Sequence, residues 1–331
     1  MTINILSNII QTPSGGGNQF LKALEKEFRK RNVYQENPTQ ADIILFNSFN
    51  FIEEGMFFKL LKLKKLGKAL VHRIDGPISL YRGKDVELDH IIYDINNQIA
   101  DATVFQSQWS KEENHILGMK SKQFECIIMN APDSDIFNSE KKIEFSNKRR
   151  IKIIATSWSN NPNKGFDVYQ WLDNALDFTK YEMVFIGNSP IKFSNIVHFP
   201  AMDSLELSKK LKQSDIYITA SKKDPCSNSL IEALHCKLPS IVYNDGGHPE
   251  ILSNAGEVFN SKEEIVPLLE KIVTNYETYQ RAIHLANIEN IAEQYMSFFA
   301  SIQYNKKSLM YEKIFISLLR YYLWKVKNKL C

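Results

Sequence analysis

Short apolar runs alternate with longer segments of helical period along most of the chain, and this alternation restricts the fold more than any other feature. Segments of this kind are typical of a mostly parallel sheet covered by helices on both faces. In the first half of the chain the predicted strands are 3–6, 42–46, 69–72, 102–105 and 126–129, with helices near 18–31, 55–66, 89–100 and 109–117.

A polar, charged segment, 132–150, interrupts the pattern and is predicted to be a linker. The alternation then restarts. Because one hydrophobic core rarely organises more than about 250–300 residues, we expect an α/β protein of two Rossmann-like, doubly wound domains facing a cleft. The predicted strands of the second half are 151–155, 183–187, 196–199, 215–219 and 240–243, with helices near 166–178, 203–212, 227–236, 261–274 and 276–300.

The composition excludes several classes of protein. Hydrophobic residues make up 44% of the chain and charged residues 24%, and the net charge of +3 is too small to indicate nucleic-acid binding. The four cysteines form no C-x-x-C pair, which argues against a zinc site. The sequence has neither a signal peptide nor an apolar run of about 18 residues, so we expect a cytoplasmic protein.

Ligands of doubly wound domains bind beyond the carboxyl ends of the strands, and one such segment is "DPCSNSLIEALHCKLPSIVYNDGG", 224–247. Ser227 is a predicted N-cap, and the free N–H groups of the following helix turn would attract an anion. Glu232, one helix turn further on, is suited to accept two hydrogen bonds from a diol such as a ribose. Asp224 precedes the helix and is placed to contact a second polyol. The alternative is a capped helix with an exposed Glu232 and a solvated Asp224.

Glycines mark two more candidate loops. Gly16 and Gly17 lie in "TPSGGGNQF", between the first strand and the first helix, and predict a phosphate or sugar loop. Gly246 and Gly247 follow the strand at 240–243, where close backbone approach and a helix beginning near His248 would again favour an anion.

Charged residues mark the remaining two loops. Lys164, in "SWSNNPNKGFDVYQWL", is placed to meet a phosphate as a point charge, or is simply exposed. The segment "VHRIDGP", 71–77, is expected to place His72, Arg73 and Asp75 in one loop after the third strand. The alternative for these three residues is a salt-bridged turn.

Taken with their order along the chain, these motifs resemble the retaining glycosyltransferases of family 4, which have the GT-B fold. The resemblance covers roughly residues 3–300 and is strongest in "SKKDPCSNSLIEALHCKLPSIVYNDGGHPEIL". It implies a first domain at 1–147, a nucleotide-sugar domain at 148–290, and C-terminal helices at 291–331 that return to the first domain.

The resemblance also implies roles for single residues. Glu232 would bind the ribose of a sugar nucleotide, Asp224 the transferred sugar, and Lys164 the diphosphate. The backbone of Asn228, Ser229 and Leu230 would seat the same diphosphate. Further residues with a counterpart in the family are Gly16 and Gly17, Ser107 in "ADATVFQSQWS", Gly246 and Gly247, and His72 or Asp75 near the sugar.

Two departures from the family pattern stand out. The first carboxylate is Asp224 in place of a glutamate, and the region where an arginine is expected holds Trp158 and Ser159. Neutralisation of the leaving diphosphate would then fall on Lys164, helix N-termini and Lys222, Lys223 or Arg73. The expected reaction is transfer of a hexose-type sugar with retention, in which the leaving phosphate takes the acceptor's proton and no metal takes part.

The tail 306–330 has seven basic residues and one acid, and its period predicts a basic amphipathic helix. Such a helix lies on an anionic membrane surface, or it docks on the first domain with a solvated basic face. The function predicted for the chain is transfer from a nucleotide-diphosphate sugar, with no bound cofactor, to a glycan or lipid-linked acceptor. The alternatives are a non-catalytic nucleotide-sugar-binding module and a sugar-nucleotide epimerase.

Overall fold

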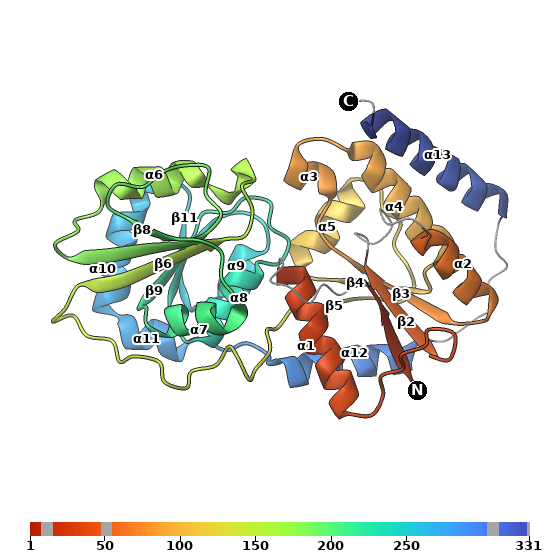
Figure 1. Cartoon of the computed structure of the whole chain (residues 1–331), viewed down its shortest axis with the longest axis horizontal. Helices are drawn as coiled ribbons and strands as arrows, with labels where there is room; N and C mark the ends of the chain where they lie inside the picture. Colours follow the sequence, from red (N-terminus) through yellow and green to blue (C-terminus); the bar gives the residue numbers. More distant parts are fainter. Residues whose placement is uncertain (8–15, 48–54, 303–310, 330–331) are drawn as a thin grey trace. The chain divides into compact units, whose positions relative to one another are not determined.

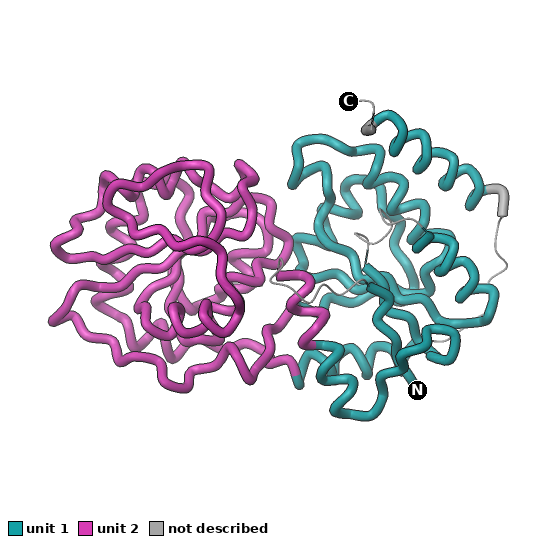
Figure 2. Tube along the Cα trace, in the orientation of Figure 1, with its two compact units in different colours: residues 1–9, 24–129, 289–331 teal, residues 10–23, 130–288 magenta. Residues whose placement is uncertain are grey.

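The computed structural model describes residues 1–7, 16–47, 55–302 and 311–329. The chain forms two compact units, which Figure 2 distinguishes by colour. Unit 1 comprises residues 1–9, 24–129 and 289–331, and unit 2 comprises residues 10–23 and 130–288. Each unit has its own parallel sheet, as the sequence predicts.

The sheet of unit 1 has five parallel strands in the order β1-β2-β3-β4-β5 (Figure 1). Buried side chains alternate between the two faces of these strands, so helices are needed on both. The strands are β1 (Ile3–Leu6), β2 (Ile43–Asn47), β3 (Ala69–Ile74), β4 (Ala102–Phe105) and β5 (Glu125–Ile127). The helices that belong wholly or partly to unit 1 are α1 (Gly16–Lys30), of which residues 16–23 belong to unit 2, α2 (Met56–Lys65), α3 (Ile78–Arg82), α4 (Val86–Ile99), α5 (Gln108–Ile116), α12 (Ile288–Ser301) and α13 (Tyr311–Lys329).

The sheet of unit 2 has six parallel strands in the order β11-β10-β9-β6-β7-β8. Its chain moves outward from β6 through β7 to β8 and then returns to place β9 on the other side of β6, so the strand order reverses between β6 and β9. The strands are β6 (Ile151–Ser157), β7 (Tyr181–Gly187), β8 (Val197–Phe199), β9 (Ile216–Thr219), β10 (Ser240–Tyr243) and β11 (Gly256–Phe259), and the helices are η2 (Pro162–Lys164), α6 (Phe166–Ala175), α7 (Ser204–Lys212), α8 (Asn228–His235), α9 (His248–Leu252), η3 (Lys262–Glu264), α10 (Ile265–Thr274) and α11 (Tyr276–Arg281).

All ten predicted strands are present, with ends shifted by up to two residues. The structure differs from the sequence pattern at one strand and one helix. Strand β11 lies at the edge of its sheet, and only Phe259 of its four residues is fully buried. The single helix predicted at 276–300 is wrong: α11 ends at Arg281 and α12 begins at Ile288. Between them Ile283 is buried and its carbonyl accepts a hydrogen bond from the Lys237 ammonium at 2.9 Å.

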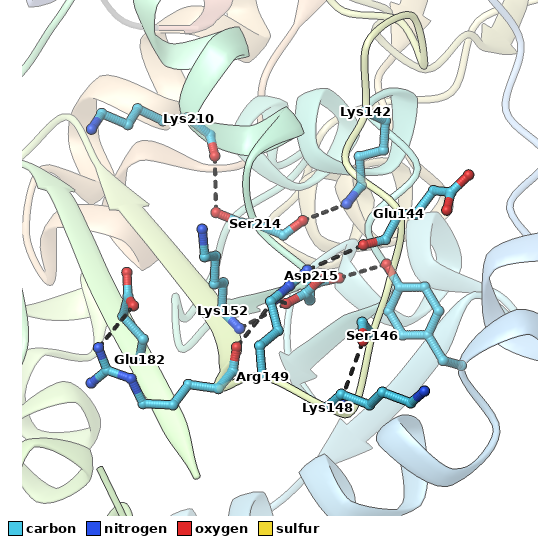
Figure 3. Close-up of polar contacts among 12 residues, drawn as sticks. Lys142, Glu144, Ser146, Lys148, Arg149, Lys152, Glu182, Lys210, Ser214 and Asp215 are labelled. Atoms are coloured by element: carbon cyan, nitrogen blue, oxygen red, sulfur yellow. Dashed lines mark hydrogen bonds and ion pairs between the residues drawn. The ribbon is translucent and has the colours of Figure 1, made fainter. Parts of the chain in front are cut away.

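The predicted linker, 132–150, contains no helix or strand and is part of unit 2. Figure 3 shows its polar contacts, which centre on the fully buried Asp215. The Asp215 carboxylate accepts hydrogen bonds from the Arg149 guanidinium at 2.7 and 2.9 Å and from the Lys152 backbone N–H at 2.8 Å. These bonds fix the end of the segment to the start of β6.

The C-terminal helix α13 packs on α4 within unit 1 (Figure 1). Ile314 and Tyr321 are buried in the same core cluster as the apolar side chains of α4. The docking alternative for the tail is therefore confirmed for the part of the tail within 311–329. Among the described residues, no helix combines the length and apolar character that crossing a membrane requires.

We predict that Arg149→Ala lowers the free energy of unfolding by about 3 kcal/mol, because it leaves the buried Asp215 carboxylate without its partner. The neighbouring Arg150→Ala is a matched control. Arg150 pairs with Glu182 at 3.3 Å on the exposed surface, and its loss should cost no more than about 0.5 kcal/mol. Chemical denaturation of both variants measures the difference, and equal effects would contradict the structural role assigned to Asp215.

Candidate active site

The candidate site lies at the carboxyl ends of β6 and β9, where the strand order of unit 2 reverses. Open α/β sheets bind ligands at such a switch point. Lys164 follows β6 and Asp224 follows β9, and the structure brings the Lys164 Nζ within 3.1 Å of the Asp224 Oδ2. Two residues predicted from separate motifs thus form one ion pair.

Lys164 is positioned by close packing of its loop on the segment after β9. Gly165 has φ +72°, and a Cβ at this position would overlap the carbonyl oxygen of Ala220. The Lys222 N–H donates to the Asn163 carbonyl at 2.6 Å, and the Ala220 N–H donates to the Tyr169 hydroxyl at 3.1 Å. The loop therefore follows the backbone of residues 220–222 closely.

Asp224 is held from the other side by the glycine turn after β10. Gly246 has φ +66°, and a Cβ there would overlap the Asp224 backbone. The Gly247 N–H donates to the Asp224 carbonyl at 2.9 Å. The backbone of these two glycines thus lies close to the Asp224 backbone. Contact of Gly246 and Gly247 with a ligand stays a prediction.

The surroundings of Asp224 favour its ionised form. Burial alone would raise the pKa of this carboxyl, but the charge and hydrogen bond of Lys164, together with the nearby His248 and the Cys226 N–H, outweigh burial, and the net shift of the pKa is downward. Its side chain is only 14% exposed, so the alternative of a solvated Asp224 is wrong.

Helix α8 begins at Asn228, and Ser227 is its N-cap residue as predicted. The Ser227 side chain makes no capping bond, and its Oγ lies 3.2 Å from the Ser229 Oγ. The first-turn N–H groups of Asn228, Ser229 and Leu230 have no acceptor within the helix, which is the property an anion seat requires. Leu230 itself is fully buried, so only its backbone is suited to this role.

The start of α1 lies against the start of α8 within unit 2. A Cβ on Gly16 would overlap the Asn228 side chain, whereas one on Gly17 would meet nothing within 4 Å. The Asn228 Oδ1 accepts a hydrogen bond from the Asn130 Nδ2 at 3.0 Å. Residues 12–15 of the predicted glycine loop are outside the described residues.

Glu232 is buried, with 8% of its surface exposed, so the alternative of an exposed glutamate on α8 is wrong. None of the described residues donates a hydrogen bond to its carboxyl group. Burial raises the pKa of Glu232 to about 8. A buried carboxyl group without a donor is costly to ionise, and ligand hydroxyls would offset that cost.

His72, the histidine predicted to lie near the sugar, belongs to unit 1. His72 and Arg73 belong to β3 and not to the loop after it, which corrects the placement expected from the sequence. The His72 ring is fully buried, stacks on Phe46 with centroids 4.6 Å apart, and has its Nδ1 2.9 Å from the Asn96 amide. Burial lowers the pKa of His72 to about 3. These contacts make it a neutral core residue.

Asp75, one residue beyond β3, is half-exposed and is the better placed of the two candidates in unit 1. Its carboxylate contacts the Gln106 side chain and lies 3.4 Å from the Arg73 Nη1. The salt-bridged turn considered for this segment is therefore present.

Ser107 caps α5, and its side chain accepts a hydrogen bond from the Ser110 N–H at 3.0 Å.

Two lysines were candidates for the charge of the missing arginine. Lys223 pairs with Asp245 at 3.3 Å, and the Lys222 ammonium lies 5.4 Å from the centre of the Tyr243 ring. Within the described residues, no group of three or more His, Cys, Asp or Glu side chains has the arrangement of a metal site.

Residues 192–287 match the family model for glycosyl transferases group 1. This match includes Asp224, Glu232 and the glycine turn, but it does not extend to Lys164. A probable sucrose-phosphate synthase of Thermosipho melanesiensis is 26% identical over 160 residues, which are 45% of this chain and 38% of that protein. The chain thus spans well under half the length of this relative.

Solved structures resemble the chain over a larger part of its length. Anabaena HepE in complex with UDP gives a TM-score of 0.68 at 11% identity, covering 91% of this chain and 100% of that one. Sucrose-phosphate synthase from Thermosynechococcus elongatus gives 0.60 at 13% identity, covering 89% and 82%. The predicted GT-B fold is confirmed, and residues 192–287 match the glycosyl transferases group 1 model, in line with the resemblance drawn from the sequence.

We predict that Gly165→Ala lowers the free energy of unfolding by about 3 kcal/mol, because backbone strain and overlap with Ala220 add together. Gly83→Ala is the matched control, since Gly83 has a similar φ of +68° but a Cβ there would meet nothing within 4 Å. Gly83→Ala should lower the free energy of unfolding by only about 1 kcal/mol, because it adds backbone strain without an overlap. Denaturation curves compare the two, and equal costs would contradict the close packing of the two loops.

Proposed function

We propose that the chain is a retaining glycosyltransferase of family 4, working in the cytoplasm. It would move a sugar from a nucleotide-diphosphate sugar to a glycan or lipid-linked acceptor in surface polysaccharide biosynthesis. The observation that carries the proposal is the buried carboxyl group of Glu232, which lies within the segment that matches the group 1 model and accepts no hydrogen bond from the described residues.

The donor would lie along the N-terminal turn of α8. The backbone N–H groups of Asn228, Ser229 and Leu230 would bind the diphosphate, with the positive end of the helix dipole behind them. Glu232, one turn further along, would accept two hydrogen bonds from the ribose diol. Asp224 precedes the helix and would meet the transferred sugar.

Lys164 would stabilise the negative charge that develops on the leaving diphosphate. An ammonium group has three N–H donors, so Lys164 can contact a phosphate while keeping its bond to Asp224. As the glycosidic bond loosens, the sugar acquires oxocarbenium character, and the leaving phosphate takes the acceptor's proton on the same face. This route assigns no proton transfer to a protein side chain.

The proposal extends to the nucleotide. Anabaena HepE has been solved in complex with UDP and in complex with UDP-glucose. We propose a UDP-sugar as the donor of this chain. The fold that it shares with HepE would accommodate the same diphosphate and ribose.

A non-catalytic nucleotide-sugar-binding module is the second candidate. Trp158 and Ser159 stand where the family has an arginine, and Lys223 is already paired with Asp245, so less positive charge faces a leaving diphosphate. An epimerase on the same architecture would convert the sugar without releasing it.

We predict slow release of nucleoside diphosphate from one donor in a panel of UDP-, GDP-, ADP- and dTDP-sugars. Lys164→Ala should lower kcat by about 10²-fold or more, because it removes charge stabilisation needed mainly as the bond breaks. Glu232→Ala should raise the Kd for the donor by about 10²-fold, through the loss of two hydrogen bonds to a charged group. Coupled assay of diphosphate release measures the first, and calorimetric titration the second.

Three other outcomes would redirect the proposal. Binding without release in the presence of candidate acceptors would favour the binding module. An altered sugar that stays attached to its nucleotide would favour the epimerase. Absence of nucleotide binding by the folded chain would contradict the roles assigned to residues 224–232.

The raised pKa of Glu232 predicts a pH dependence of donor binding. In the ligand-free protein the carboxyl group is mostly protonated below its pKa of about 8. A diol donates to the ionised form, so binding releases a proton, and affinity should rise with pH up to about 8 and then level off. Titrations between pH 6 and 9 should show this slope in the native chain and a flat profile in Glu232→Gln; a slope that persists in the variant would assign the titration to another group.

A further inference from the structure

Helix α13 is apolar on two opposite faces, and only one of them is covered. The covered face contains Ile314 and Tyr321, which are buried against α4. Two polar contacts with α4 fix the orientation of the helix: Gln98 with Ser317 at 2.9 Å, and Arg320 with Asp94 at 2.8 Å. The helix therefore has one defined outward face.

That outward face carries six large apolar side chains, each between 47% and 66% exposed. At 100° per residue they fall on one arc of about 120°, centred opposite the buried pair. They account for six of the fourteen exposed large hydrophobic residues in the described part of the chain. These six residues therefore form one apolar patch and are not isolated on the surface. They are Phe315, Ile316, Leu319, Tyr322, Leu323 and Val326.

Basic residues border this apolar stripe. Lys313, Arg320 and Lys327 follow one another at intervals of seven residues, which places them along one edge of the stripe. Lys313 and Lys327 are exposed. Long basic side chains at the edge of an apolar face can keep their charge at the level of lipid headgroups while the face enters the acyl boundary.

We infer that the outward face of α13 binds the surface of an anionic membrane. A second copy of the chain would fit the apolar stripe, but it would bring the basic edges of two identical helices together, and the resulting repulsion is absent on anionic lipid. No described helix meets the requirements for crossing a bilayer, so α13 would lie in the interface plane.

The inference deepens the proposed function, because a lipid-linked acceptor lies at the same surface. Vesicle binding is measured without a donor, and donor turnover is measured without lipid. The failure of one proposal is therefore distinguishable from the failure of the other.

The test is vesicle flotation of the full chain, with vesicles of phosphatidylcholine alone and vesicles in which about a third of the lipid is phosphatidylglycerol. We expect binding to the anionic vesicles that weakens with salt. Leu319→Gln/Leu323→Gln should lower the partition coefficient by at least about tenfold, since two leucines no longer enter the apolar layer. Lys313→Gln/Lys327→Gln should lower it several-fold.

Leu205→Gln is the matched control, because Leu205 is 60% exposed on α7 of unit 2 and should leave binding unchanged. Thermal melting confirms that each variant is folded. Absence of vesicle binding, or equal binding by the native chain and the double leucine variant, would overturn the inference. So would a dimer in solution that the double leucine variant converts to a monomer, since the stripe would then be covered by a second copy.

Discussion

The candidate site depends on how closely two loops approach one short backbone segment, residues 220–224. Gly165 meets this segment at Ala220 and Gly246 meets it at Asp224, both with φ in the left-handed region and both at a distance that excludes a Cβ. The first contact positions Lys164 and the second fixes the carbonyl of Asp224. Because these loops come from β6 and β10 on either side of β9, the parallel strand order brings a lysine and a carboxylate together that are 60 residues apart in the chain.

The two acidic residues of the site differ in charge because their surroundings differ. Both are largely buried, and burial alone raises the pKa of each. For Asp224, Lys164, His248 and the Cys226 N–H together reverse this effect, whereas among the described residues none offsets it for Glu232. Asp224 therefore keeps a fixed negative charge and orients Lys164, while Glu232 is ready to change its protonation state when hydroxyl donors arrive. An ion pair and a partly neutral carboxyl group thus lie at the two ends of a proposed donor site.

Much of this arrangement follows from the sequence. The periodicity predicts ten of the eleven strands found in the described residues, and strand order in parallel sheets places Lys164 and Asp224 at the same edge. The edge strand β11 escaped notice because only Phe259 is fully buried, so its apolar pattern is weak. The sequence does not reveal how far β3 extends, so the predicted strand ends at His72, whereas β3 continues through Arg73 to Ile74. No local sequence pattern predicts the close contact between Gly165 and Ala220, because these two residues are far apart in the sequence. Lys164 and Asp224 were predicted separately, and only the folded chain joins them.

Helix α13 shows why a sequence pattern can predict two contacts without choosing between them. An amphipathic helix normally has one apolar face, and docking on a protein core or binding a membrane then exclude each other. Here the apolar residues fall on two opposite faces, which Lys313, Ser317 and Arg320 separate on one side and the half-buried Leu318 joins on the other. Ile314 and Tyr321 pack on α4, and the stripe that includes Leu319 and Leu323 remains exposed. The docked face holds the helix in one orientation, so the outward stripe is presented as a preformed surface and loses little conformational entropy on binding. Docking would therefore favour the membrane binding that we infer for the opposite face.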